Sequence, residues 1–507
     1  MYYFLNYEYG LRKFNDAGYC VLRRYDKSFY MPITEKEFDI LKEAWKTSIS
    51  DDDRNKRSVI EKFSLYDILL PLVNGEYNSK DNWQCKICDN DLHMEMEVAI
   101  TQRCNYNCKY CFEAADTNKM TDEFTLEEMD ALLDDAVRCG INCIALTGGE
   151  PMVHKDFMSI ISLISNKGLG ISEVLTNGSM ITDEFLDKLS TYDCCRHTVF
   201  RISFDGVRDK HNSIRQTNSE DTVFKNIKRC IEHGFKVKVT YNLNHQNEDE
   251  LKDTALLMYN VGVSEFRIVR TMPSRKLRAL EMNNIIFSHE EWLNAALDFA
   301  NWYMYLTNSC SYNVFEETSM SIDFWNVFYL NPRKHMITLN AIKGCGHKNI
   351  DDELILCPLT KSRICICGDG SMVPCHQISG GLKKQGIDLG NVKRDGLYSI
   401  LKDSKWKDLI NTKVTERLKY QEKCKSCEYW DMCLGGCPVI GAPWRWEYGE
   451  KFPFSTDVTQ CAFFEGDYIS KFKKLVEDYK WHLPIFFGLP LPINEEQPGR
   501  TRMELRK

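Results

Sequence analysis

The sequence predicts an α/β protein: a parallel sheet in the middle of the chain, a small α+β unit before it and a cysteine-rich domain after it. Three observations predict this. Short apolar runs alternate with amphipathic stretches through the middle of the chain, as in βαβ units. Strand-like alternation precedes helical spacing near the N-terminus, and cysteines gather from Cys345 to Cys461. The 507 residues leave room for about three domains.

The first unit, residues 1–80, is expected to be winged-helix-like. Residues 19–24 and 28–31 alternate as strands do, Thr34 and Glu37 form a capping box that starts a helix, and a second helical stretch spans 58–73. Such modules often bind DNA, but the net charge of -8 favours a peptide partner and no nucleic acid. A packing appendage without a ligand is the alternative.

A polar linker over 75–91 leads into the sheet, which is expected over 90–285. A helix from 125 to 139 has its own capping box, Thr125 with Glu128, and Gly140 as terminator. Six strand and helix units predict a barrel-like or open parallel sheet whose ligands lie at the carboxyl ends of the strands. The six predicted strands end near Ile100, Leu146, Leu175, Phe204, Asn242 and Val269.

Three further segments complete the chain. Residues 286–340 are expected to be a helical, aromatic bridging region and residues 341–470 a metal-organised domain. The tail, 471–507, contains an apolar, proline-broken stretch at 482–493 that is expected to pack on a neighbouring surface or on a second subunit.

Composition narrows the class of protein. The chain is 43% hydrophobic and 27% charged, has no signal-like start, and has no apolar run near the roughly 20 residues of a membrane span. We therefore expect a cytoplasmic protein with no membrane partner. In that reducing compartment the 22 cysteines are expected to ligate metal where they cluster, not to form disulfides.

The first cysteine cluster is Cys104, Cys108 and Cys111, directly after the first predicted strand of the sheet. Three thiolates on a short loop hold three irons of a cubane and leave the fourth iron open. The open iron can chelate the amino and carboxylate groups of a methionine-like cofactor. A structural zinc ion would need four ligands, usually in two pairs.

At these residues, RCNYNCKYCFE, the sequence resembles the radical S-adenosylmethionine (SAM) superfamily. The family's later landmarks follow in order as TGGEP (147–151), LTNG (175–178), SFDG (203–206) and Arg215. The resemblance implies a partial (β/α)6 barrel that binds SAM. The glycines would approach its ammonium, a glutamate would add charge, a serine and an arginine would contact its ribose or carboxylate, and a tyrosine would lie beside its adenine. The residues implied are Tyr110, Gly148, Gly149, Glu150, Asn177, Ser203 and Arg215.

The C-terminal cysteines resemble the seven-cysteine pattern of the SPASM domain, which carries two auxiliary four-iron clusters in related enzymes. Cys345 is a natural eighth ligand; without it, one cluster would keep an open iron. The resemblance implies one set of Cys345, Cys357, Cys375 and Cys437, and a second set of Cys424, Cys427, Cys433 and Cys461. Either Cys365 or Cys367 could replace Cys345 or Cys357. A zinc ribbon on Cys424, Cys427, Cys433 and Cys437 is the alternative.

The other cysteine pairs are not expected to have a role. Cys85 and Cys88 cannot hold a tetrahedral metal alone and are either a linker feature or a redox pair. Cys194 and Cys195 are interpreted as ordinary core or helix-end residues.

Together the resemblances imply a peptide maturase with three 4Fe-4S clusters that works anaerobically. It would bind a ribosomal precursor peptide through its leader, take electrons from a donor such as flavodoxin or ferredoxin, and oxidatively install a cross-link. A thioether from cysteine is favoured over a carbon-carbon link.

Two other functions stay open. An anaerobic sulfatase-maturing enzyme shares the architecture, but that family has an aspartate base where this chain has His376. A non-enzymatic zinc-binding peptide adaptor is the hypothesis from another class.

Overall fold

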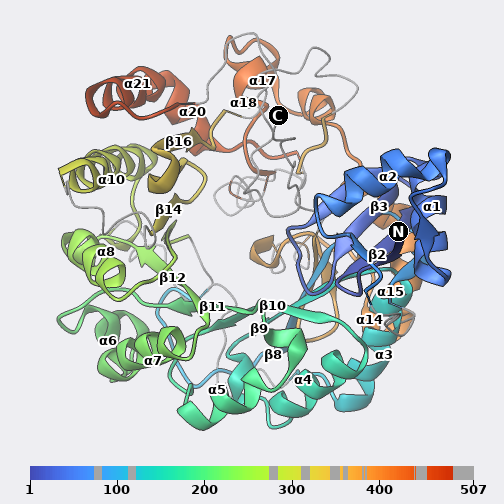
Figure 1. The fold of residues 1–507 in the computed structure, drawn as a ribbon. Coiled ribbons are helices and arrows are strands. Elements are labelled where there is room, and N and C mark those ends of the chain that lie inside the picture. The colour runs from blue at the N-terminus through green and yellow to red at the C-terminus, as the bar shows by residue number, and fades with distance from the viewer. Residues whose placement is uncertain are drawn as a thin grey trace.

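The computed structural model describes residues 1–73, 83–111, 122–272, 284–309, 320–342, 354–357, 363–378, 382, 385–438, 440 and 454–483. Within them an eleven-stranded sheet curves through the middle of the molecule, with helices on its outer side (Figure 1). The three cysteines of the first cluster are among the described residues, whereas Cys345 and residues 484–507 lie outside them.

The N-terminal unit contains two small sheets ordered β4-β3-β2-β7 and β5-β1-β6. Its elements are β1 (Tyr2–Leu5), β2 (Tyr9–Phe14), β3 (Gly18–Arg23), β4 (Tyr30–Ile33), α1 (Glu35–Lys46), β5 (Ile49–Ser50), α2 (Arg54–Ser64), β6 (Leu69–Pro71) and β7 (Cys85–Ile87). The predicted capping box is confirmed, since Thr34 and Glu37 bond reciprocally at the start of α1.

The predicted helix over 58–73 is wrong in its second half. Asp53 caps α2 earlier, at Arg54, and the helix ends at Ser64. Asp67 then takes a left-handed backbone (φ 55°), and β6 pairs with β1. Strand β7 also pairs in parallel with β2, so the unit extends beyond residue 80 into the expected linker.

The six predicted parallel strands are confirmed, in chain order and beside one another. They are β8 (Glu95–Thr101), β9 (Cys143–Gly148), β10 (Gly170–Thr176), β11 (Val199–Ser203), β12 (Lys236–Leu243) and β13 (Glu265–Arg270). The α-helices between and after them are α3 (Leu126–Arg138), α4 (Phe157–Asn166), α5 (Asp183–Ser190), α6 (Lys210–Arg215), α7 (Glu220–Glu232), α8 (Leu251–Asn260) and α10 (His289–Ser309). The capping box of Thr125 and Glu128 starts α3 as expected.

The bridging region is helical only in its first half. After α10 the chain adds β14 (Ser321–Phe324) to the sheet as a parallel neighbour of β13, and β15 (Phe328–Asn331) and β16 (Met336–Leu339) follow antiparallel. Alternate burial along β14 places Ile322 and Phe324 in the core. The expectation of helix throughout this region is therefore wrong, because it followed aromatic content and missed this two-residue period.

The opposite edge of the sheet is completed from the C-terminal domain. There β17 (Arg363–Ile366) pairs in parallel with β8, and β18 (Met372–Val373) follows antiparallel. Because β16 and β18 end the strand order, the barrel is open within the described part of the chain. The domain's α-helices are α14 (Val392–Asp395), α15 (Leu397–Lys402), α16 (Ser404–Ile410), α17 (Glu422–Lys425), α18 (Trp430–Cys433), α20 (Val458–Glu465) and α21 (Tyr468–Tyr479).

Short 3-10 helices complete the assignment: η1 (Pro151–Val153), η2 (Asp193–Cys195), η3 (Glu248–Glu250), η5 (Pro332–Lys334), η6 (His376–Ile378) and η7 (Val414–Lys419). Figure 1 shows α20 and α21 beside α10, where the hydroxyl of Tyr468 donates to Asn294 and that of Tyr479 to Asn301. The predicted tail contributes His482, which bridges to Met336; the rest of its apolar stretch from residue 484 is outside the described residues. No described helix has the length and apolarity that crossing a membrane requires.

Candidate active site and cluster-binding cysteines

The loop that carries the first three cysteines begins where β8 ends, at the carboxyl edge of the sheet. Cys108 is buried, and Cys104 and Cys111 are half-buried. Burial raises the pKa of Cys104 to about 12, and the nearby carboxylate of Glu150 and the thiols of Cys108 and Cys111 act in the same direction. Three thiols on one short loop fit a cationic iron centre, which deprotonates the thiols it binds.

Side chains from neighbouring strands hold this loop. The hydroxyl of Tyr106 donates to Ser219 Oγ at 2.5 Å, and its backbone N–H donates to Cys104 Sγ at 3.4 Å. The side-chain amide of Asn177 donates to Asn105 Oδ1 at 2.7 Å. Asn177 was predicted to bind the cofactor; the contact that the structure shows is to the cysteine loop.

Gly148 and Gly149 bring the end of β9 against the root of the same loop. A Cβ on Gly149 would lie 2.6 Å from the carbonyl oxygen of Gln102, and one on Gly148 would overlap the carbonyl of Thr101. The N–H groups of Gly149 and Glu150 donate 2.8 Å hydrogen bonds to carbonyls of the loop. Both glycines thus permit a close backbone contact between β9 and the cysteine loop. The sequence predicted only that they let the backbone approach the ligand.

Glu150 is completely buried. Its carboxylate accepts hydrogen bonds from Thr176 Oγ1 and Asn177 N, both at 2.7 Å, and from Met152 N at 3.1 Å. Burial nevertheless raises the pKa of Glu150 to about 7. A carboxylate in this condition fits a cationic ligand group, because an ammonium would supply the missing charge.

Asp205 joins the two remaining predicted residues. Its buried carboxylate accepts a hydrogen bond from the hydroxyl of Tyr110, a 2.7 Å bond from Arg215 Nε, and a 2.7 Å bond from Asn242 N. Ser203 stands two residues earlier, at the end of β11. The structure therefore brings Tyr110 and Arg215 together on one aspartate. The sequence alone assigned no role to Asp205, although it belongs to the SFDG motif.

The sheet also carries buried ion pairs that sequence analysis missed. Arg201 bridges Glu173 and Glu265, each at 3.2 Å, and Lys27 from the N-terminal unit reaches Glu95 at 2.7 Å. Although burial raises the pKa of Glu173, Arg201 and Lys27 hold it well below its usual value. In the sequence these residues appear only as polar side chains at alternate strand positions, and their ion-pair partners cannot be read from it.

The cysteines that the SPASM resemblance implies as ligands lie in the C-terminal domain, apart from Cys345, which is not among the described residues. Burial raises the pKa of Cys375 to about 12, and the thiols of Cys437 and Cys357 add to the effect, which places these three thiols close together. Cys345, the fourth member of that set, lies outside the described residues. The second set is spread over α17, the following turn, α18 and α20, at Cys424, Cys427, Cys433 and Cys461.

One further group could hold a metal ion. Ligand atoms of Glu97, Cys365 and His376 all lie within 4.8 Å of one another, and Cys367 Sγ is 3.9 Å from His376 Nδ1. The group adjoins Cys375 in sequence, so it borders the first auxiliary set. Arg363 already pairs with Glu97 at 2.8 Å.

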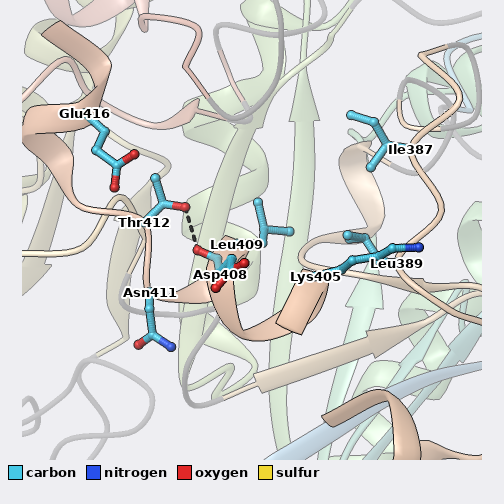
Figure 2. A pocket seen from close by; sticks show the side chains of 8 residues that line it. All are labelled: Ile387, Leu389, Lys405, Asp408, Leu409, Asn411, Thr412 and Glu416. Carbon is cyan, nitrogen blue, oxygen red and sulfur yellow. Dashed lines mark hydrogen bonds between the residues drawn. The ribbon is translucent and has the colours of Figure 1, made fainter. Parts of the chain in front are cut away.

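The two cysteine pairs without an expected role lie in or beside apolar clusters. Cys88 is buried under Gly140 in a small apolar cluster, and Cys85 lies on β7. Cys194 and Cys195 are buried in the main core. A hollow of about 540 Å³ lies beside α16. Figure 2 shows the side chains that line it: Ile387, Leu389, Lys405, Asp408, Leu409, Asn411, Thr412 and Glu416. It contains none of the predicted site residues.

Comparison with known proteins agrees with this arrangement. The Radical SAM superfamily profile matches residues 98–258, and the profile of an iron-sulfur cluster-binding domain, SPASM, matches residues 357–428. The Fe-coproporphyrin III synthase of Methanosarcina barkeri is 30% identical over 149 residues, 29% of this chain and 36% of that protein. The AdoMet-dependent heme synthase of Oleidesulfovibrio alaskensis is 25% identical over 348 residues, 68% of this chain and 81% of that protein.

Two solved structures share the fold. Streptococcus suis SuiB bound to its precursor peptide SuiA superposes with a TM-score of 0.61 at 13% identity, over 90% of this chain and 99% of that one. Native anSMEcpe with bound AdoMet gives a TM-score of 0.55 at 15% identity, over 76% of this chain and 99% of that one.

The chain therefore has the domains of a radical SAM enzyme, with the radical SAM domain at residues 98–258. More particularly, a SPASM domain follows at residues 357–428, and together the two domains support binding of SAM and iron-sulfur clusters.

Proposed function

We propose that this enzyme modifies a ribosomal precursor peptide by an oxidative cross-link, preferably a thioether from a cysteine of the substrate. The observation that carries the proposal is the cysteine loop at the carboxyl end of β8, joined in one chain to an N-terminal unit and to a second cysteine-rich domain. When bound, a four-iron cluster with SAM supplies a 5'-deoxyadenosyl radical, which abstracts an unactivated hydrogen atom.

The protein's own groups position the cofactor. Cys104, Cys108 and Cys111 would hold the cluster, and the buried Glu150 would meet the ammonium of SAM. Asp205 fixes Tyr110 and Arg215 for the adenosyl and carboxylate groups, with Ser203 beside them. Gly148, Gly149 and Asn177 hold the cysteine loop against the ends of β9 and β10. Preorganisation of this kind replaces the acid and base groups that other enzymes need.

The auxiliary cysteines are proposed to hold two more clusters, three in all. The sets are those that the SPASM resemblance implies, and the electrostatic influence of Cys357 and Cys437 on Cys375 supports the first set. An acceptor for the substrate's second electron makes the net reaction a two-electron oxidation. An external donor such as flavodoxin or ferredoxin would supply the electron that starts the reaction.

The N-terminal unit is proposed to bind the leader of the peptide. Strand β4 ends its sheet, so its outer edge can accept an added strand. The solved structure of SuiB with SuiA spans 90% of this chain, whereas anSMEcpe spans 76%. This additional coverage favours a peptide maturase with its own recognition unit over a sulfatase-maturing enzyme.

We propose working domain limits of 1–80 (with β7), 90–285, 286–340, 341–470 and 471–507.

A first experiment tests the cluster chemistry. Anaerobically purified protein is expected to be brown, with about 12 irons for three clusters. The triple variant Cys104→Ala, Cys108→Ala, Cys111→Ala should lose about four of these irons and all 5'-deoxyadenosine formed from SAM under dithionite. Colourless protein with stoichiometric zinc would support the adaptor hypothesis instead.

A second experiment tests the substrate. The enzyme should be co-expressed with each short peptide encoded beside its gene, and each peptide should lose about two mass units per cross-link. A precursor peptide without its leader should stay unmodified while SAM cleavage continues. If no peptide changes but a sulfatase motif is oxidised, the enzyme is a sulfatase-maturing one. If the enzyme instead converts a porphyrin, its function is that of the heme synthase relatives.

A further inference from the structure

Arg417, on η7, is a buried arginine of the C-terminal domain. Its side chain is 0% exposed. No ion pair joins it to a carboxylate in the described part of the chain, and its Nε and Nη2 atoms are buried without a hydrogen-bond acceptor there. A buried and unpaired cation is costly, so a structure that keeps one has an anion for it.

The turn between Cys433 and Cys437 wraps this guanidinium. Arg417 Nη1 donates to the carbonyl oxygens of Leu434 at 2.5 Å and Gly436 at 3.3 Å. Gly435 has a φ of 75°, and a Cβ there would lie 2.7 Å from Arg417 Cδ. The glycines of CLGGC therefore allow the arginine to enter the loop between two proposed ligands.

The candidate anions near this guanidinium are three cysteines and the buried carboxylate of Asp457. That carboxylate already accepts hydrogen bonds from Asn326 and from the backbone N–H groups of Cys437 and Thr459. Burial lowers the pKa of Arg417, and the thiols of Cys424, Cys437 and Cys433 oppose that effect. Cys424 and Cys433 belong to the second proposed set and Cys437 to the first. The guanidinium thus lies next to ligands of both sets.

We propose that Arg417 is the shared countercation of the two auxiliary clusters, with Nε and Nη2 as hydrogen-bond donors to their sulfur ligands, and that it raises their reduction potentials. The proposal rests on the ligand role proposed above for these cysteines. A cluster with four thiolates is anionic and gains one more negative charge when it takes an electron. A fixed nearby cation therefore stabilises the reduced form more than the oxidised form.

The test isolates the auxiliary clusters. In the Cys104→Ala, Cys108→Ala, Cys111→Ala background, the remaining iron belongs to the C-terminal domain. Potentiometric titration followed by electron paramagnetic resonance then compares Arg417→Gln, Arg417→Lys and the control Arg394→Gln, whose arginine is exposed and paired with Asp388 and Asp395. At a fixed potential, Arg417→Gln should lower the reduced-to-oxidised ratio at least tenfold, which is about 59 mV for one electron.

The potentials and iron contents of these variants support or overturn the countercation role of Arg417. Arg417→Lys should keep most of the wild-type potential, and Arg394→Gln all of it. Loss of auxiliary iron in Arg417→Gln but not in Arg417→Lys would also support the proposal, because lysine keeps the positive charge that glutamine lacks. Unchanged potentials in Arg417→Gln, equal iron loss in both variants, or an equal shift in the control would overturn it. Iron-free background protein would refute the ligand assignment itself, and the countercation with it.

Discussion

At the scale of single residues, the candidate site depends on polar groups that are buried and fully used. Asp205 illustrates this, because one carboxylate receives Tyr110, Arg215 and the backbone of Asn242. A neutral side chain at this position would leave the guanidinium of Arg215 buried without its partner. The fixed geometry of both proposed cofactor contacts thus depends on the charge of Asp205.

The substitution Asp205→Asn should lower the free energy of unfolding by about 3 to 5 kcal/mol, the usual cost of breaking a buried ion pair. Urea unfolding followed by tryptophan fluorescence measures this change. The matched control is Asp253→Asn, whose carboxylate forms an exposed pair with Arg208. The control should cost less than about 1 kcal/mol. A similar loss in both variants would contradict the role given to Asp205.

Acid should destabilise the protein through His211. Burial, with the charge of Arg215, lowers the pKa of His211 from 6.5 to about 3. Because the pKa of His211 is lower in the folded than in the unfolded protein, the folded protein is most stable above the unfolded-state pKa. It loses stability as the pH falls from that pKa towards the folded-state pKa. Between pH 7 and pH 5 the loss should be about 2 kcal/mol.

His211→Gln should keep an acceptor for the N–H of Asp205, which donates to Nδ1 at 3.2 Å, and should remove that slope. Unfolding free energies of both proteins at the two pH values provide the measurement. Parallel slopes would show that other groups cause the acid sensitivity.

The residues of this site were only partly predictable. Tyr110 and Arg215 come from their motifs, but Asp205 resembles an ordinary turn residue until a tyrosine from another loop meets it. The charge of Arg417 was equally hidden, since its neighbours Cys424 and Cys437 are recognised as ligands without reference to it. Local patterns identify the residues at the end of a strand, whereas partners from other loops depend on the folded sheet.

At the scale of elements, the end of β9 sets the position of the cysteine loop. Gly149 N donates to Thr101 O at 2.8 Å, and the absent side chain of Gly149 leaves room for the carbonyls of Gln102 and Arg103. Any Cβ at Gly149 pushes the loop away from the strand that leads to Glu150. Cluster and proposed ammonium site would then separate.

Gly149→Ala should therefore reduce the rate of 5'-deoxyadenosine formation about a hundredfold, the effect of a displacement near 1 Å. Chromatographic assay with saturating dithionite measures the rate, and iron content shows whether the cluster is kept. Gly168→Ala is the control: this glycine has a positive φ (71°), but its Cβ would meet nothing within 4 Å. Equal losses in both variants would mean that general destabilisation explains the result.

Elements were predicted best where periodicity is local. All six strand ends and both capping boxes were predicted from spacing alone, and the structure confirms them. The strands that were missed include β6, β14, β15 and β16, which are three or four residues long. Segments so short have little periodicity of their own, and pairing with distant strands decides their conformation.

At the scale of the whole molecule, the N-terminal unit is anchored to the large sheet. Lys27 Nζ lies 2.7 Å from Glu95 Oε1 and 3.2 Å from Glu173 Oε1. Asn142 adds hydrogen bonds to the carbonyls of Arg23 and Asp26. The proposed recognition unit and the barrel are thus joined through buried charge.

Lys27→Met should weaken this connection by about 3 kcal/mol, because two buried carboxylates lose a shared cation. Hydrogen exchange of β3 amides should accelerate by about a hundredfold, since each 1.4 kcal/mol is a factor of about ten. Lys56→Met, which removes only partly exposed pairs with Glu43 and Asp53, should change nothing beyond its own helix. Unaltered exchange in Lys27→Met would show that the apolar contacts alone hold the unit.

The pairing of β17 with β8 also concerns how the protein is made. The strand that completes this edge of the sheet is translated late, since Arg363 comes 268 residues after its partner Glu95. At ribosomal speeds of about 5 to 20 residues per second, the nascent chain exposes that edge for roughly 15 to 50 seconds. During this interval the unpaired edge of β8 is a template for aggregation, so chaperone supply should limit the yield of soluble enzyme.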